Sequence, residues 1–334
     1  MNKSTNILFM IILIVSIIIS ISSNSWFIVW MGMEINMMAF LPMMIEQKNI
    51  MSKESSLTYF MTQTIASMLL LMSIMTINKT MIFMEMKVSE LMMLSSLMMK
   101  SGISPFHFWM PKVMEGLNWN MCLILMTWQK ITPLMMMSNL MKVNMITITG
   151  MTLSIIVGAV GGLNQMSLRK LMAYSSISNN GWMLMAMMIS ETMWLMFFFM
   201  YMIMMTIMTM TMKNHKNYHI NQITSMNETT TKKFMLMLNM LSISGLPPML
   251  GFMPKWMIIQ SMMTMKELML MSIMIIMTLI TVYYYLRIMF PVMLLTNPEP
   301  SWNNPYNKIN NIPMMLSVMS IMGLTTITLF MFLY

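Results

Sequence analysis

The sequence predicts an all-α polytopic membrane protein that crosses the bilayer about eleven times. Hydrophobic residues make up 57% of the 334 residues and charged residues only 9%, which is far from the composition of a soluble globular protein. Runs of about 20 apolar residues, each enough to cross a hydrocarbon layer of roughly 30 Å, follow one another with short gaps. A soluble core could not use so many apolar segments, so a soluble fold is excluded.

The apolar runs define the predicted transmembrane helices. The first run, residues 7–21, follows Lys3 as the core of a signal peptide would, but it has no small-x-small cleavage site. We therefore expect it to be the first span. The predicted spans are residues 5–23, 25–45, 57–77, 88–110, 119–141, 145–163, 168–189, 191–212, 233–264, 268–290 and 313–333.

Two of these spans carry matching Gly/Pro interruptions. Residues 101–114 and 244–257 align without a gap at an offset of 143 positions, and Ser, Gly, Pro, Met, Pro, Lys and Met coincide. Because glycine and proline interrupt helices, spans 88–110 and 233–264 are each predicted to be two half-helices in series. Paired breaks at corresponding places in two halves of a membrane chain indicate a transport site.

The position of the breaks predicts the architecture. Each break falls in the fourth member of a group of five spans, and because five is odd, the second group enters the membrane from the opposite side. The prediction is an inverted repeat: a first five-helix bundle over residues 1–142, a second over 143–296, and a surface loop with a C-terminal transmembrane helix over 297–334.

The distribution of basic residues predicts orientation and partners. Most lysines and arginines lie in the gaps on the N-terminal side, which places the N-terminus in the cytoplasm or the mitochondrial matrix. They form no single stripe, which argues against nucleic-acid binding. Cys122 is the only cysteine, so neither a disulfide nor a metal or iron–sulfur cage is expected. The 66 methionines occur on every span, which fits an organellar coding bias.

Four charged residues lie near the middle of predicted spans. Each would cost about 2.5–3.5 kcal/mol at the centre of a membrane helix, so together they approach roughly 10–14 kcal/mol before pairing. Buried ion pairs are weak stabilisers, which favours a functional role over the alternative that these charges only orient packing. They are Glu34, Lys100, Lys130 and Lys255.

Lysine in this setting is suited to carrying a proton. Loss of hydration disfavours its charged form, and a nearby carboxylate favours that form again. Glu34 is the only predicted intramembrane carboxylate, so it is the expected partner in the first half. His107 could relay protons between Lys100 and Lys130, or it could be a satisfied interior histidine.

Three further patterns predict no functional site. His215 and His219 have the spacing of a helical metal pair, but no third ligand lies nearby in the sequence. G-A-V-G-G at 158–162 follows no predicted strand, so it indicates close helix packing rather than dinucleotide binding. Lys112 aligns with Lys255 in the internal repeat, but it is expected to be a solvated loop residue at the end of its span.

Five motifs follow one another along the chain. They are W-M-G-M-E-I-N (30–36), M-K-S-G-I-S-P-F-H-F-W-M-P (99–111), T-W-Q-K-I-T-P (127–133), G-G-L-N-Q-M-S-L-R-K-L-M-A-Y-S-S-I (161–177) and G-L-P-P-M-L-G-F-M-P-K-W (245–256). In these motifs and their order the sequence resembles the antiporter-like subunits in the membrane arm of respiratory complex I, and the resemblance covers nearly the whole chain. It implies a proton-translocating subunit of NADH:ubiquinone reductase in the mitochondrial inner membrane, with its N-terminus in the matrix.

The resemblance also implies cofactors, partners and site residues. The chain itself would bind no NADH, FMN, iron–sulfur cluster, ubiquinone or metal, and its neighbours would be membrane lipids, the antiporter-like chain 4 and the small chain 4L. The intramembrane glutamate and lysines of the family fall on Glu34, Lys100, Lys130 and Lys255. Unlike longer relatives, the chain has no carboxylate near position 177, 143 positions after Glu34.

Two other functions would use the same features. A stand-alone cation/proton antiporter of the same fold would use similar lysines and would exchange sodium on its own. A structural membrane scaffold would keep the buried charges for assembly and stability alone.

Overall fold

The structure is a computed structural model that describes residues 3–46, 49–79, 83–141, 144–224 and 230–294. Within these ranges the chain is helical and contains no β-strand, apart from an isolated bridge between Ser167 and His219. The predicted all-α class is therefore confirmed, as expected for apolar segments whose backbone must be satisfied internally in lipid. Tertiary contacts divide the chain into two compact units, Met1–Ser154 and Ile155–Tyr334.

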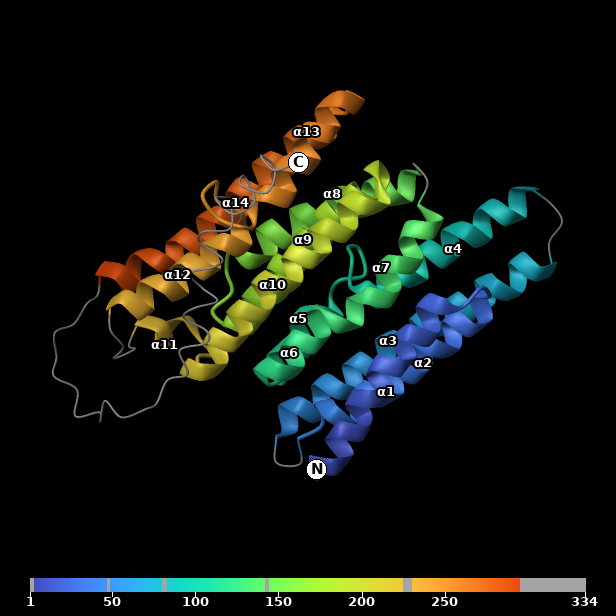
Figure 1. Ribbon diagram of the computed structural model, residues 1–334, viewed down its shortest axis with the longest axis horizontal. Helices are drawn as coiled ribbons and strands as arrows, with labels where there is room; N and C mark the ends of the chain where they lie inside the picture. The colour runs from blue at the N-terminus through green and yellow to red at the C-terminus, as the bar shows by residue number, and fades with distance from the viewer. Residues whose placement is uncertain (1–2, 47–48, 80–82, 142–143, 225–229, 295–334) are drawn as a thin grey trace, which may run out of the picture. The chain divides into compact units, whose positions relative to one another are not determined.

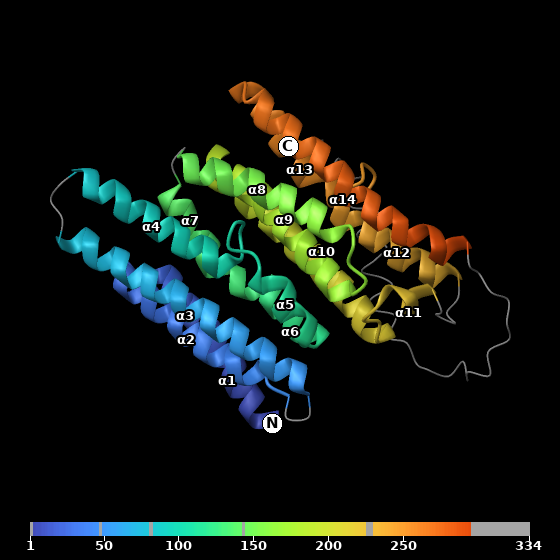
Figure 2. The ribbon, with the colours of Figure 1, turned by 180° about the vertical axis from the view of Figure 1, so that it is seen from behind.

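The first unit contains helices α1 to α7 and the start of α8. In both ribbon views α1, α2 and α3 lie side by side (Figures 1 and 2), and α3 also packs on α4 and α5. Helix α7 packs on α4 and α1. The bounds are α1 (Lys3–Ser22), α2 (Trp26–Met44), α3 (Ile50–Lys79), α4 (Phe83–Ser101), α5 (Trp109–Gly116), α6 (Trp119–Met126), α7 (Trp128–Leu140) and α8 (Met145–Gly162).

The second unit contains the end of α8 and the helices that follow it. Helix α10 packs on α9, α12 and α13, and α12 packs on α14. The bounds are α9 (Leu168–Ile189), α10 (Glu191–His215), α11 (Ile220–Thr224), α12 (Thr230–Ser244), α13 (Phe252–Met265) and α14 (Leu268–Leu294).

Three predicted spans consist of two helices each. Spans 88–110 and 233–264 are divided between α4 and α5 and between α12 and α13, at the predicted Gly/Pro interruptions. Span 119–141 is also divided, at Thr127 between α6 and α7, which the sequence analysis did not predict. The Thr127 hydroxyl donates to the Leu123 carbonyl at 2.7 Å, which satisfies part of the end of α6. The span predicted at 313–333 lies outside the described residues.

Six helices in the described part of the chain are long and apolar enough to cross a membrane, namely α1, α2, α3, α8, α10 and α14. Large apolar side chains on their outer faces are exposed, such as Ile7, Met68 and Leu279. Such faces suit contact with lipid. The boundary between the two units falls inside α8, later than the predicted boundary between bundles at 142/143.

Many buried serine and threonine hydroxyl groups are satisfied within their own helices. The hydroxyl of Ser16 donates to the Leu13 carbonyl at 2.9 Å, and that of Ser154 donates to the Met151 carbonyl at 2.8 Å. Many other serines and threonines repeat this bond to the carbonyl three residues earlier. Small polar residues therefore remain in apolar helices without a partner on another helix.

Helices α8 and α9 approach each other closely at a glycine. A Cβ atom at Gly158 would lie 2.6 Å from the Ser178 backbone nitrogen and 2.8 Å from the Tyr174 carbonyl oxygen. Both obstacles are backbone atoms, which cannot move without shifting a helix. This contact confirms the close packing predicted from the G-A-V-G-G sequence.

We predict that Gly158→Ala destabilises the protein by about 1–3 kcal/mol, because the new methyl group must push α8 away from α9. Gly161→Ala is the matched control: the three atoms nearest to its Cβ all belong to the ring of Tyr174, a half-buried side chain that can move. The midpoint of thermal aggregation in mild detergent should fall further for Gly158→Ala than for Gly161→Ala. Equal losses would contradict this account of the contact.

Candidate functional site

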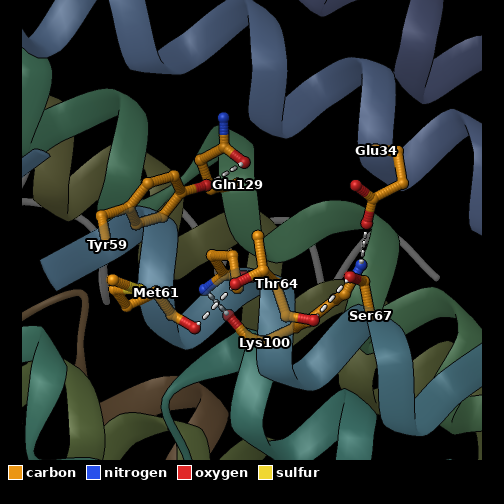
Figure 3. A network of polar contacts seen from close by, with 8 residues as sticks. Glu34, Tyr59, Met61, Thr64, Ser67, Lys100 and Gln129 are labelled. Carbon is orange, nitrogen blue, oxygen red and sulfur yellow. Dashed lines mark hydrogen bonds and ion pairs between the residues drawn. The ribbon is translucent and has the colours of Figure 1, made fainter. Parts of the chain in front are cut away.

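An ion pair between two helices is the first feature of the site. Glu34 on α2 and Lys100 on α4 face each other, with 3.8 Å between the Glu34 Oε1 and Lys100 Nζ atoms (Figure 3). The Lys100 side chain is only 6% exposed and the Glu34 side chain is 22% exposed. The structure therefore brings together the carboxylate and the lysine that the sequence analysis paired.

The interruption between α4 and α5 positions this lysine. Helix α4 ends at Ser101, one residue after Lys100, and Gly102 adopts φ +73°, a left-handed conformation that favours glycine. Side chains donate hydrogen bonds to two of the carbonyl groups at the end of α4. The Trp109 indole donates to the Met99 carbonyl at 3.1 Å, and the Gln63 amide donates to the Lys100 carbonyl at 3.4 Å.

Lys100 and Lys130 line the same cavity. Lys130 lies on α7 and is 1% exposed. The cavity has a volume of about 20 Å³, which is room for about one water molecule. Its other polar lining residues include Asn36, Gln63 and Gln129. Glu34, Lys100 and Lys130 thus belong to one continuous polar region inside the first unit.

A chain of hydrogen bonds crosses this region. The Tyr59 hydroxyl donates to Gln129 Oε1 at 3.4 Å, and Gln129 Nε2 donates to Asn36 Oδ1 at 3.1 Å (Figure 3 shows the first bond). The bonds join α3, α7 and α2, and Gln129 is the sequence neighbour of Lys130. Neutral amides and a phenol therefore line the cavity together with the two lysines and join α2, α3 and α7.

Sequence reasoning missed these neutral residues, although some signals were present. Tyr59 and Gln63 are four residues apart on α3, so they lie on one helix face. Gln129 precedes Lys130, and Asn36 closes the motif that contains Glu34. Polar side chains at these places in apolar segments could have been added to the predicted site.

His107 lies in the interruption between α4 and α5. Its Nδ1 atom is 3.3 Å from the Pro105 carbonyl oxygen, and its ring centroid is 4.2 Å from that of Phe108. It is buried, but it is not among the residues that line the cavity shared by Lys100 and Lys130. A relay role for His107 between these lysines stays a prediction.

Lys255 lies in the second unit, near the start of α13. It is 7% exposed, and its Nζ atom donates to the Ser244 carbonyl at 2.8 Å. The Nζ atom also lies 5.9 Å from the centre of the Trp182 ring, within the range of a cation–π contact. Lys112, its counterpart in the internal repeat, is exposed as predicted, although it lies on α5 rather than in a loop.

Comparison with known proteins places these features in a family. A family model for the NADH:quinone oxidoreductase/Mrp antiporter transmembrane region matches residues 23–281. NADH-ubiquinone oxidoreductase chain 2 of Anopheles gambiae is 43% identical over 337 residues, covering 98% of both chains. The chain 2 proteins of Aedes aegypti and Locusta migratoria are 48% and 44% identical, with 98% of each relative covered.

Solved structures share the fold at low sequence identity. A chain of respiratory complex I from Thermus thermophilus has a TM-score of 0.84 at 17% identity, with 97% of this chain and 79% of that chain covered. A chain of the Mrp complex from Dietzia has a TM-score of 0.83 at 14% identity, with 96% and 75% covered. The chain therefore belongs to the NADH:quinone oxidoreductase/Mrp antiporter family of membrane proteins, and within it to the NADH-ubiquinone oxidoreductase chain 2 group.

Proposed function

We propose that this chain is a core membrane subunit of NADH:ubiquinone oxidoreductase and contributes a proton-translocation channel. The observation that carries the proposal is the Glu34–Lys100 ion pair beside a cavity that Lys130 also lines. Relatives that are 43–48% identical over nearly their whole length support the assignment to this complex. Electron transfer from NADH to ubiquinone takes place in other subunits, and this chain has no redox centre of its own.

The proposed channel works by making and breaking the ion pair. While the pair is closed, the Glu34 carboxylate stabilises the charged amine of Lys100. When it opens, Lys100 loses its counter-charge and its proton passes across the cavity to Lys130. Moving one proton against about 150–200 mV requires roughly 3.5–4.6 kcal/mol. Loss of a counter-charge in a region of low dielectric constant changes the energy of an ammonium group on that scale.

Lys255 is proposed to carry the proton in the second half, toward the outer side or to the next subunit. Ile177 occupies the position 143 residues after Glu34, and it is buried. The second half would therefore use one lysine without a titratable partner at that position.

The proposal includes the membrane topology of the chain and its neighbours in the complex. The chain would have eleven transmembrane helices, with an inverted repeat of residues 1–142 and 143–296 and its N-terminus in the mitochondrial matrix. It would lie in the inner membrane beside chain 4, chain 4L and lipids. The matched breaks after Ser101 and Ser244 support the repeat, and the basic gaps on the N-terminal side support the orientation.

We predict that the chain migrates within a very large complex when mildly solubilised membranes are separated by native electrophoresis. The band should coincide with in-gel oxidation of NADH, because the proposal makes the chain a subunit of that enzyme. Migration as a small particle with sodium-dependent exchange would contradict the assignment and favour a stand-alone antiporter.

We predict that Lys130→Met lowers the number of protons translocated per NADH oxidised, because the variant has no amine to accept the proton from Lys100. The measurement uses the assembled complex in sealed vesicles. Lys112→Met is the control, since it removes an exposed lysine outside the cavity and should leave the ratio unchanged. A wild-type ratio in Lys130→Met would show that Lys130 carries no proton.

Variants of the Glu34–Lys100 pair distinguish a proton-pumping function from a purely structural scaffold function. Glu34→Gln leaves a buried amine without its carboxylate, and the loss of stability should be at or below the roughly 3–5 kcal/mol found for fully buried pairs. The double variant Glu34→Gln/Lys100→Met removes both charges and should recover much of that stability.

We predict that proton translocation stays impaired in the double variant, although the amount of assembled complex recovers. Assembly is measured from the intensity of the native band, and pumping from acidification per NADH oxidised. Joint recovery of assembly and pumping would support the scaffold function and contradict the proposed channel.

A further inference from the structure

The two interruptions share their backbone geometry. Gly102 and Gly245, 143 positions apart, both adopt left-handed conformations, with φ +73° and +84°. The next residue bonds back to its helix in each case: Ile103 N donates to the Met98 carbonyl at 3.0 Å, and Leu246 N donates to the Leu241 carbonyl at 3.5 Å. The following helices restart at Trp109 and Phe252, again 143 positions apart.

The two interruptions differ in what contacts the end of the first half-helix. After α4, the neutral side chains of Trp109 and Gln63 donate to the exposed carbonyls. After α12, the Lys255 amine donates to the Ser244 carbonyl at 2.8 Å. The C-terminal end of a helix carries a partial negative charge. The amine of Lys255 therefore contacts the partial negative charge of the backbone carbonyls at the end of α12.

Gly245 leaves the space through which Lys255 reaches this carbonyl. A Cβ atom at Gly245 would lie 3.0 Å from both the Cδ and Nζ atoms of Lys255. The three atoms nearest to a Cβ atom at Gly102 belong instead to Met110 and Trp109, and the closest is the Met110 sulfur at 3.1 Å. The two glycines have the same backbone role, but the atoms nearest to Gly245 include the amine of Lys255.

We infer that Gly245 is a positioning residue for Lys255, and that the C-terminal end of α12 replaces the missing carboxylate of the second half. This inference rests on the proposed role of Lys255 in proton translocation. A carbonyl cannot take up the proton as the Glu34 carboxylate can. The proton of Lys255 therefore passes to a water molecule, leaving a neutral amine and a hydronium ion, when the side chain turns away from the Ser244 carbonyl, and the absence of a Cβ atom at Gly245 leaves room for that movement.

A Lys255→Met background provides the test. Gly245→Ala imposes backbone strain, so it should reduce the amount of assembled complex. In the complex that assembles, Gly245→Ala should lower the protons translocated per NADH oxidised to the value of Lys255→Met. In a Lys255→Met background, Gly245→Ala should cause no further loss, because its effect passes through the amine. Gly161→Ala is the control: it lies in the second unit, its Cβ meets the Tyr174 ring, and it should keep the wild-type ratio.

Three outcomes would overturn the inference. They are a wild-type ratio in assembled Gly245→Ala, an equal loss in Gly161→Ala, and a further loss when Gly245→Ala is added to Lys255→Met. If Gly245→Ala does not assemble, Gly245→Asn replaces it, since asparagine tolerates the left-handed conformation but still carries a Cβ atom. A wild-type ratio in Lys255→Met would instead refute the proposed role of Lys255, which separates that failure from this one.

Discussion

Burial of charge is the constraint on which the first unit depends. An ammonium group in a membrane interior is costly, and Lys100 is almost fully buried with the Glu34 carboxylate 3.8 Å away. This contact places Glu34 of α2 opposite the end of α4, which stops at Ser101. The cavity that Lys130 shares and the hydrogen bonds from Gln129 to Asn36 and from Tyr59 to Gln129 lie around the same place.

In the second unit, a backbone carbonyl rather than a carboxylate stabilises the buried amine. Lys255 contacts the Ser244 carbonyl at the end of α12 and lies over the Trp182 ring. The Glu34 carboxylate can take up a proton from its lysine, whereas the Ser244 carbonyl cannot. Lys100 and Lys255 therefore differ in whether their partner can exchange a proton with them. The two units thus hold buried amines in chemically different ways.

Most features that the sequence predicted correctly are local. The Glu34–Lys100 pair is the exception, and it could be predicted because Glu34 was the only carboxylate expected inside a span. Gly102 and Gly245 interrupt helices because of their own backbone preferences, and their spacing is visible in the sequence. The helix break at Thr127 and the bond between Gln129 and Asn36, 93 residues apart, were not predicted. Apolar residues cover nearly every face of these helices, so periodicity does not reveal which faces meet. The neutral residues of the site depend on that tertiary information.

The proposed channel requires the Glu34–Lys100 pair to change its charge state or its contact during turnover. Redox-induced infrared difference spectroscopy on the assembled complex in lipid can detect this change, with Glu34→Gln used to assign the carboxyl signal. We expect a signal from Glu34 in the wild-type difference spectrum when NADH is oxidised and its absence from the spectrum of the variant. Identical spectra for both proteins would contradict the claim that this pair takes part in proton translocation.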